Sequence, residues 1–88
     1  MSAVRSRDEI AKRVIELAAE QVGVDVAMVT EATQFEADLN YDSLDMVDLI
    51  MNLEEAFDLS IPDEQAEGVK SVGEAIGLVE RALLMPRE

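Results

Sequence analysis

The four residues Asp42-Ser43-Leu44-Asp45 mark the start of the most regular apolar pattern in the chain. Aspartate is a preferred helix N-cap, and a second aspartate three residues later places negative charge in the first turn. Together they predict a helix that begins at Ser43 and runs to about Phe57. The serine would then stand at the exposed start of a helix, with acids close on both sides.

This predicted helix has a wide apolar face. Its apolar side chains follow helical spacing at Leu44, Val47, Ile50, Met51, Leu53 and Phe57, with Met46 and Leu49 widening the stripe. Residues three and four apart are neighbours on a helix, so its acids form an acidic ridge that runs down from the serine. The acidic ridge consists of Asp45, Asp48, Glu54 and Glu55.

Two further segments show the same period. Ser6 and Glu9 form a capping box before a helix over about 7–22, which Gly23 ends. A second capping box precedes a last helix, which Pro86 would close. The box consists of Ser71 and Glu74, and the residues expected to be buried are Val72, Ala75, Ile76, Val79 and Leu83. Glycines at 73 and 77 would weaken this helix.

The stretches between the helices are irregular. Within 24–41 one short turn is expected near Val26, Met28 and Val29, while Phe35 and Leu39 would pin the rest of the loop to the core. Such a long loop in a small domain is more often functional than idle.

A short helix is expected before the last capping box. Pro62 biases Ile61 toward extended backbone, and Asp63 would cap a turn that ends at Gly68. Together with the three longer helices, this short helix predicts an all-α fold, a small four-helix bundle. We expect one domain over 1–88, with an ordered core at about 6–84.

The residues that the chain lacks exclude several kinds of site. It has no cysteine and no histidine, which rules out disulfides, thiolate metal sites, Ser-His and Cys-His nucleophilic pairs and the usual zinc ligand sets. Its first residues lack the apolar core of a signal peptide, and no apolar run is long enough to cross a bilayer. We expect a cytoplasmic protein with no membrane partner.

The charge of the chain is strongly one-sided. The formal net charge is −13, and no lysine or arginine occurs between Arg13 and Lys70. That interval holds fifteen acids. Such a field repels nucleic acid and attracts basic protein surfaces. A solvated, solubilising face is the plainer interpretation of the same pattern.

Part of the acidic region has the spacing of a calcium loop. Asp38, Asn40 and Asp42 match the first three ligand positions of an EF-hand. That loop requires glycine at its sixth position and glutamate at its twelfth, where this chain has Ser43 and Leu49. We therefore expect no specific metal site, although the acids could bind divalent cations weakly.

Ser43 is also a poor candidate for a catalytic nucleophile. A serine hydroxyl needs a base, and without histidine the chain offers only carboxylates, lysines and arginines. Asp42 and Asp45 would raise the cost of forming an alkoxide. The chain is therefore expected not to be an enzyme, although a serine at a helix start is accessible as a substrate for another enzyme.

The chain resembles an acyl carrier protein, most closely the freestanding bacterial type of dissociated fatty acid synthesis. The resemblance lies in the block FEADLNYDSLDMVDL from Phe35 to Leu49, continuing through Leu53-Glu54-Glu55-Ala56-Phe57 to Ile61-Pro62-Asp63-Glu64. A bare Asp-Ser-Leu would usually be only a helix cap, whereas the full set of spaced residues is highly specific. The similarity extends from Ile10 to Leu83.

The resemblance implies that Ser43, flanked by Asp42 and Leu44, carries 4′-phosphopantetheine through a phosphodiester. A magnesium-dependent phosphopantetheinyl transferase would install this group from coenzyme A, and its thiol would hold acyl groups as thioesters. The free N–H groups and dipole of a helix start favour a phosphate. Asp42 and Asp45 oppose it, and would instead recruit metal ions and the basic surface of the transferase.

The resemblance also implies two sets of contact residues. The acidic ridge would meet basic surfaces of fatty acid synthesis enzymes, with Leu44 and Met51 as apolar contacts; core packing is the alternative for these two. The acyl chain would be sheltered by Phe35, Leu49, Ile50, Leu53, Ile61, Ala66, Val69, Ala75 and Ile76. We expect a monomer whose partners visit it briefly.

Two residues depart from the family pattern. Asn40 and Tyr41 stand where the family commonly has glycine and a small residue. Asparagine is the next most tolerant residue of left-handed backbone, so the turn can be kept. Tyr41 would place a bulky ring beside the attachment site, where it would pack against the pantetheine arm or restrict which partners dock.

Two other functions stay open at this point. One is a carrier for polyketide, aminoacyl or other specialised lipid intermediates, which differs in the acyl groups and enzymes that it accepts. The other is an unmodified acidic module that docks through the acidic ridge.

The one-sided charge predicts a stability that depends on salt. Raising the ionic strength from about 10 mM to about 200 mM shortens the screening length severalfold and weakens repulsion among the acids. We expect the melting temperature to rise by about 5 °C, the shift that about 1 kcal/mol produces in a domain of this size. Calorimetry or circular dichroism measures it, and a melting temperature indifferent to salt would contradict the prediction.

Overall fold

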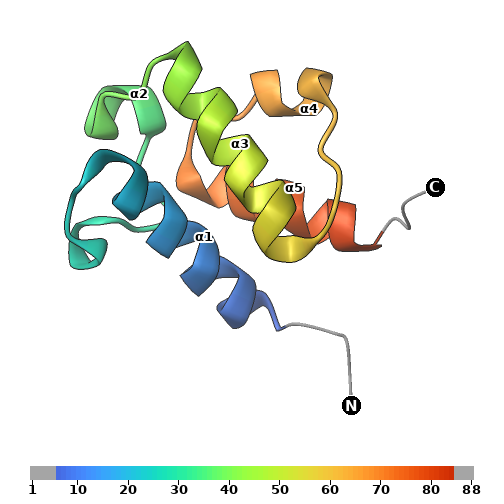
Figure 1. The fold of residues 1–88 in the computed structure, drawn as a ribbon. Helices are drawn as coiled ribbons and strands as arrows, with labels where there is room; N and C mark the ends of the chain where they lie inside the picture. The colour runs from blue at the N-terminus through green and yellow to red at the C-terminus, as the bar shows by residue number, and fades with distance from the viewer. Residues whose placement is uncertain (1–5, 85–88) are drawn as a thin grey trace.

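Three long helices frame the protein. The computed structural model describes residues 6–84, so Pro86 lies outside the described part. The long helices are α1 (Arg7–Val22), α3 (Ser43–Phe57) and α5 (Val72–Leu84); the connections contain η1 (Val26–Met28), α2 (Phe35–Leu39) and α4 (Asp63–Glu67). Figure 1 shows the start of α3 between the one-turn helices α2 and α4. The all-α helical bundle predicted from the sequence is confirmed.

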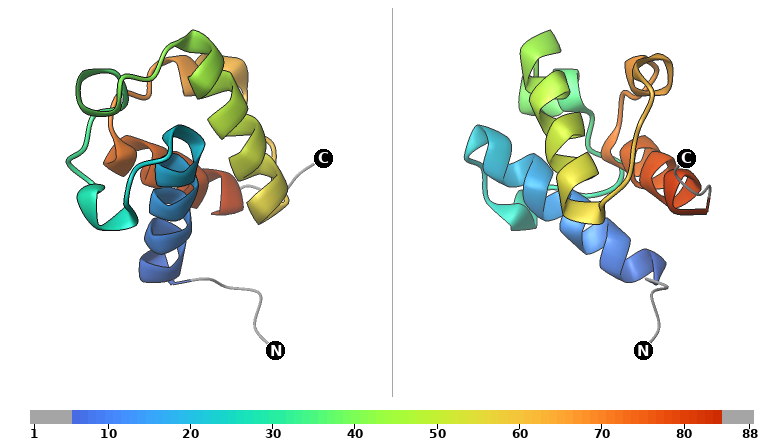
Figure 2. Two further views of the ribbon diagram at one scale, coloured as in Figure 1. Left: turned by 60° about the vertical axis from the view of Figure 1, so that its left-hand side comes forward. Right: turned by 45° about the vertical axis from the view of Figure 1, so that its right-hand side comes forward.

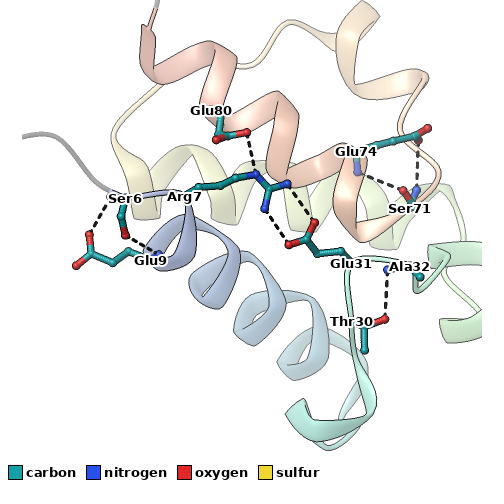
Figure 3. Close-up of polar contacts among 9 residues, drawn as sticks. All are labelled: Ser6, Arg7, Glu9, Thr30, Glu31, Ala32, Ser71, Glu74 and Glu80. Atoms are coloured by element: carbon teal, nitrogen blue, oxygen red, sulfur yellow. Dashed lines mark hydrogen bonds and ion pairs between the residues drawn. The ribbon is translucent and has the colours of Figure 1, made fainter.

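Side-chain caps set the predicted helix ends. Ser6 Oγ accepts the Glu9 N–H at 3.2 Å, and the Glu9 carboxylate accepts the Ser6 N–H at 3.2 Å. The pair Ser71 and Glu74 makes the same exchange before α5, at 3.2 and 3.3 Å, as Figure 3 shows. Gly23 ends α1 in the left-handed conformation, at φ 73°. The bounds predicted for α1 and α3 are therefore confirmed.

The loop expected over 24–41 contains a helix that the sequence did not predict. α2 is one turn long and ends at Asn40, which adopts left-handed backbone at φ 63° as expected. Asp38 accepts the N–H of Gln34 at 2.8 Å and so stabilises the start of the turn. A single turn is too short for an apolar period to be visible.

The start of α4 differs from the prediction. Its N-cap position is Pro62, not Asp63, and no side chain caps it. The carbonyl of Pro62 accepts the N–H groups of Gln65 and Ala66 at 3.0 and 3.1 Å. The predicted cap at Asp63 is therefore wrong, because the chain is already helical at that residue.

The three long helices bury one apolar core. Its fully buried large side chains are Val14, Phe35, Leu49, Leu53, Val72, Ile76 and Val79. One assignment to a buried face is wrong, because Leu83 of α5 is 39% exposed. Leu78 is buried on α5 instead. No helix within residues 6–84 is long and apolar enough to span a membrane.

The segment before α2 lies against the start of α5. The N–H of Val72 donates to the carbonyl of Thr33 at 2.9 Å, and that of Gly73 donates to the carbonyl of Glu31 at 2.8 Å. A Cβ on Gly73 would stand 3.0 Å from the Glu31 carbonyl oxygen. Gly73 therefore permits a close approach of two backbones, a role that helix propensity did not reveal.

Arg7 connects three parts of the bundle. Its guanidinium donates to both carboxylate oxygens of Glu31, at 2.8 and 3.1 Å, and lies 3.5 Å from Glu80 of α5. Figure 3 shows Arg7 between the two acids. The Arg7 hydrogen bonds and charge lower the pKa of Glu31. All three side chains are at least partly exposed, so the cluster fixes geometry more than it adds stability.

Candidate functional site

Two reciprocal hydrogen bonds define the start of α3. Asp42 Oδ1 accepts the N–H of Asp45 at 2.9 Å, and Asp45 Oδ2 accepts the N–H of Asp42 at 3.1 Å. Ser43 is the first residue of the helix, and its side chain is exposed. The predicted N-cap is therefore confirmed, and Asp45 completes a full capping box.

The capping box leaves two amides available beside the serine. Among residues 6–84, no acceptor is hydrogen-bonded to the N–H groups of Ser43 or Leu44. Such groups, with the positive end of the helix dipole, form a favourable environment for a phosphate. The start of α3 therefore fits a phosphodiester on the Ser43 hydroxyl. The neighbouring Asp42 and Asp45 carboxylates offset part of this effect.

A cavity of about 550 Å³ lies between α3 and α4 and reaches Ser43. Its volume is within the range of ligand pockets, about 300–1,000 Å³. Apolar side chains line most of it: Met46, Val47, Ile50, Met51, Ile61, Ala66 and Val69. Glu54, Asp63 and Glu67 complete the lining. We call this space the α3–α4 cavity.

Nine residues were predicted to shelter an acyl chain, and four of them line the α3–α4 cavity: Ile50, Ile61, Ala66 and Val69. The structure does not place Leu49, Leu53, Ala75 or Ile76 there, because all four are buried in the core with no exposed surface. They belong to the hydrophobic core. Their contact with cargo in a loaded protein stays a prediction.

A second cavity, of about 580 Å³, lies on the other side of Ser43. It runs between α2, the start of α3 and the connection from α4 to α5. Phe35, the ninth predicted pocket residue, lines this space with Lys70, Glu36 and other polar residues. Met46 and Val69 line both cavities. The exposed serine therefore has a hollow on each side, and the one toward α4 is the more apolar.

The apolar residues of α3 divide into two stripes. Leu49, Ile50, Leu53 and Phe57 are buried, whereas Leu44, Val47 and Met51 are 74%, 55% and 53% exposed. The exposed residues are three and four apart, so they share one face. Of the two interpretations for Leu44 and Met51, core packing is therefore wrong. Val47 belongs with them, and its spacing from Leu44 was the available signal.

The four acids of the acidic ridge are not equivalent. The side chains of Asp48 and Glu55 are exposed and make no hydrogen bond or ion pair within residues 6–84. Asp45 uses one oxygen in the capping box. Glu54 is half-buried, and its Oε2 accepts the N–H of Ile61 at 2.7 Å. Asp48 and Glu55 are thus the two acids most available to a partner.

The calcium-like spacing has a different structural use. Asp38 accepts the N–H of Gln34, and Asp42 accepts the N–H of Asp45. Asn40 supplies left-handed backbone between them. Within residues 6–84 no three acidic side chains gather closely enough to hold a metal ion.

Comparison with known proteins agrees with this geometry. A family model described as the phosphopantetheine attachment site matches residues 12–79. The acyl carrier protein of Prochlorococcus marinus is 47% identical over 75 residues, which are 85% of this chain and 94% of that protein. The chain belongs to the acyl carrier protein family.

Two further relatives agree. The acyl carrier protein of Porphyromonas gingivalis is 45% identical over 75 residues, covering 85% of this chain and 96% of that protein. The crystal structure of an acyl carrier protein from Thermotoga maritima superposes with a TM-score of 0.76 at 31% identity, over 94% of this chain and 96% of that one. Acyl carrier proteins are carriers, not catalysts, and their prosthetic group is phosphopantetheine, which carries acyl cargo between enzymes.

Tyr41, which lies close to the carrier's serine, is anchored to α1 inside the bundle. It is 4% exposed, and its hydroxyl donates to the carbonyl of Ala18 in α1 at 2.8 Å. Its ring lies against Phe35, with centroids 5.0 Å apart. Burial, with a smaller contribution from the Asp45 charge, raises the pKa of Tyr41, so the hydroxyl stays a donor. Tyr41 also lines the second cavity beside Ser43, so contact of its ring with the pantetheine arm, or an effect on docking, stays a prediction.

Gln21 is a second link between α1 and the start of α3, and it was not predicted from the sequence. Its Nε2 donates to the carbonyl of Asp45 at 3.1 Å, and its Oε1 accepts Asn52 Nδ2 at 3.3 Å. A polar residue four positions after Leu17, on the apolar stripe of α1, was the available signal. Tyr41 and Gln21 together hold the serine-bearing end of the carrier's α3 against α1.

The Tyr41 contact predicts an effect on stability without an effect on modification. Replacing Tyr41 with Phe removes one buried hydrogen bond and keeps the ring, which lowers the free energy of unfolding by about 1–2 kcal/mol and the melting temperature by about 5–10 °C. We expect the rate of phosphopantetheinylation at saturating carrier to be unchanged, as the ring is buried.

Tyrosine fluorescence supplies the control. The chain has one tyrosine, Tyr41, and no tryptophan, so the emission reports on Tyr41. Emission from the wild-type protein should resist quenching by acrylamide until the fold melts. An unchanged melting temperature in Tyr41→Phe, or free quenching of the native protein, would contradict the assignment.

Proposed function

We propose that Ser43 carries 4′-phosphopantetheine through a phosphodiester and that the carrier delivers acyl groups to enzymes of fatty acid synthesis. The observation that carries the proposal is the position of Ser43. It is an exposed hydroxyl at the first residue of α3, beside two unbonded amides and at the edge of the α3–α4 cavity. The fatty acid pathway rests on the resemblance to freestanding bacterial carriers.

In this proposal Ser43 is the substrate of a transferase. The serine oxygen forms a bond to the pantetheine-side phosphorus as the pyrophosphate bond of coenzyme A breaks. The transferase takes the hydroxyl proton, and its magnesium ion stabilises the departing adenosine 3′,5′-bisphosphate. The carrier contributes the position of the oxygen. The capping box keeps both neighbouring aspartates turned into backbone hydrogen bonds, which reduces their interference with the incoming phosphate.

The α3–α4 cavity supports shelter for acyl cargo. It begins at the attachment serine and continues past Ile50 toward Ile61. Burying methylene groups against such side chains is favourable by about 0.8 kcal/mol each. A thioester on the arm would therefore exchange between this cavity and the active sites of partner enzymes.

The exposed face of α3 supports docking of partner enzymes. Leu44, Val47 and Met51 provide an apolar strip, and the exposed acids Asp48 and Glu55 are on the same helix. A transferase and synthesis enzymes with basic docking surfaces fit this combination, since complementary charge speeds encounter more than it tightens binding. We further infer that the chain acts as a single, monomeric carrier domain in the cytoplasm, as the freestanding type implies.

Loading tests the attachment residue. Incubation with coenzyme A, magnesium and a broad-specificity phosphopantetheinyl transferase should add one phosphopantetheine mass to the wild-type protein and none to Ser43→Ala, because the variant lacks the accepting oxygen. Intact mass spectrometry reads the result, and circular dichroism confirms that the variant is folded. No gain by the wild type, or equal gain by Ser43→Ala, would overturn the proposal.

Charge reversal tests the docking face. Asp48→Lys should lower kcat/KM of the transferase by about tenfold or more, mainly through KM, because a rim charge that steers encounter is reversed. The matched control is Glu20→Lys, which makes the same charge change at an exposed site on α1. Helicity should be unchanged in both. Equal kinetics for the two variants would contradict a docking role for Asp48 and indicate that it is only a solvated surface charge.

A further inference from the structure

We infer that Glu54 is a positioning residue of the α3–α4 cavity rather than a docking residue: its carboxylate fixes the segment after α3 and thereby holds α4 as the far wall. The inference rests on the proposed function for the nature of the cargo. The position of Glu54 itself does not depend on that function.

Glu54 organises the end of α3 through both its side chain and its backbone. Its carboxylate accepts the N–H of Ile61 at 2.7 Å. Its carbonyl accepts the N–H groups of Asp58 and, at 3.0 Å, Leu59. One residue thus receives three backbone donors from the four positions that follow the helix.

The bond to Ile61 is in a protected place. Ile61 is 4% exposed and Leu59 is 5% exposed, so both side chains anchor the segment in the core. Glu54 is itself half-buried and, with Ile61, lines the α3–α4 cavity. A hydrogen bond to an ionised acceptor is roughly twice as strong as a neutral one. Without the carboxylate, the Ile61 N–H would be left without a partner in a poorly hydrated position.

The position of α4 depends on this segment. Figure 2 shows the chain running from the far end of α3 back to α4, which lies beside the start of α3. α4 has five residues, none of them buried, and no side-chain cap. Its partly buried Ala66 packs against the core, and the helix contacts α5. The place of α4 opposite α3 therefore depends on these few contacts and on the segments that enter and leave it. Releasing Ile61 would free the entering segment and let α4 move away from α3.

Glu55 provides a matched control. The two glutamates are adjacent on α3 and were assigned the same docking role from the sequence, yet Glu55 is exposed and Glu54 is turned into the protein. Replacing either glutamate with alanine removes the same negative charge. Only the replacement of Glu54 also removes a hydrogen bond to the cavity wall.

The first test uses the unmodified protein and measures hydrogen exchange of the Ile61 amide by NMR. Glu54→Ala should speed this exchange by about tenfold or more, because a charge-assisted hydrogen bond is lost. Glu54→Gln keeps an acceptor oxygen and should show a much smaller increase, whereas Glu55→Ala and Glu55→Gln should match the wild type. Unchanged Ile61 exchange in Glu54→Ala would overturn the inference.

The wild-type protein keeps the test decisive if Glu54→Ala does not fold. Its Ile61 amide should then exchange far more slowly than the amide of exposed Ser60, and Glu54→Gln should lie between the intrinsic rate and the wild-type rate. Exchange of the wild-type Ile61 amide at the intrinsic rate would overturn the inference without any variant.

The second test measures access to cargo. Protein loaded with an octanoyl-pantetheine group should release it to hydroxylamine several times faster in Glu54→Ala than in the wild type, with Glu54→Gln near the wild type and Glu55→Ala unchanged. Equal rates in all four would overturn the link to the cavity. Failure of the proposed function looks different, because the wild-type protein would then not load at all while the Ile61 exchange result still stands.

Discussion

The structure depends on the way in which α3 begins. Asp42 and Asp45 each accept the other's backbone N–H, at 2.9 and 3.1 Å. This exchange ends the extended chain after α2 and sets the first helical residue at Ser43. It also engages one oxygen of each carboxylate, and it leaves the amides of Ser43 and Leu44 unbonded within residues 6–84. A common helix cap thus produces an exposed serine in surroundings that tolerate an anion.

Hydrogen bonds on both sides of α3 keep that serine in place. On the α1 side, the Tyr41 hydroxyl donates to the carbonyl of Ala18 in α1. The side chain of Gln21 in α1 donates to the carbonyl of Asp45 at the start of α3. On the α4 side, Glu54 holds Ile61 and with it the wall of the α3–α4 cavity. Each side adjoins a cavity, and the one toward α4 is the more apolar. It is therefore the side on which the acyl chain is proposed to enter.

The sequence predicted the parts of the fold that local chemistry decides. The bounds of α1 and α3 followed from caps and period, because Ser6, Asp42 and Gly23 each satisfy backbone groups at a helix end. It did not predict α2, since one turn has no readable period, nor the role of Gly73, which depends on a carbonyl 42 residues earlier at Glu31.

The candidate site was predicted less completely, for a physical reason. The apolar residues of α3 form two stripes, one facing the core and one facing solvent. The helical spacing of these residues does not indicate which stripe the neighbouring helices cover. Val47 was therefore not assigned to the exposed contact residues. Tyr41 and Glu54 were read as surface residues because their partners, the carbonyl of Ala18 and the N–H of Ile61, are backbone groups that no sequence pattern displays.

The most direct measurement of the central claim is localisation of the prosthetic group. The protein loaded with phosphopantetheine is digested, and tandem mass spectrometry assigns the added mass to a residue. The chain offers five serines, at positions 2, 6, 43, 60 and 71. Of the four that lie within residues 6–84, only Ser43 combines an exposed helix start, two unbonded amides and an adjoining apolar cavity. We predict that the mass lies on Ser43 alone. Its presence on any other serine would contradict the account.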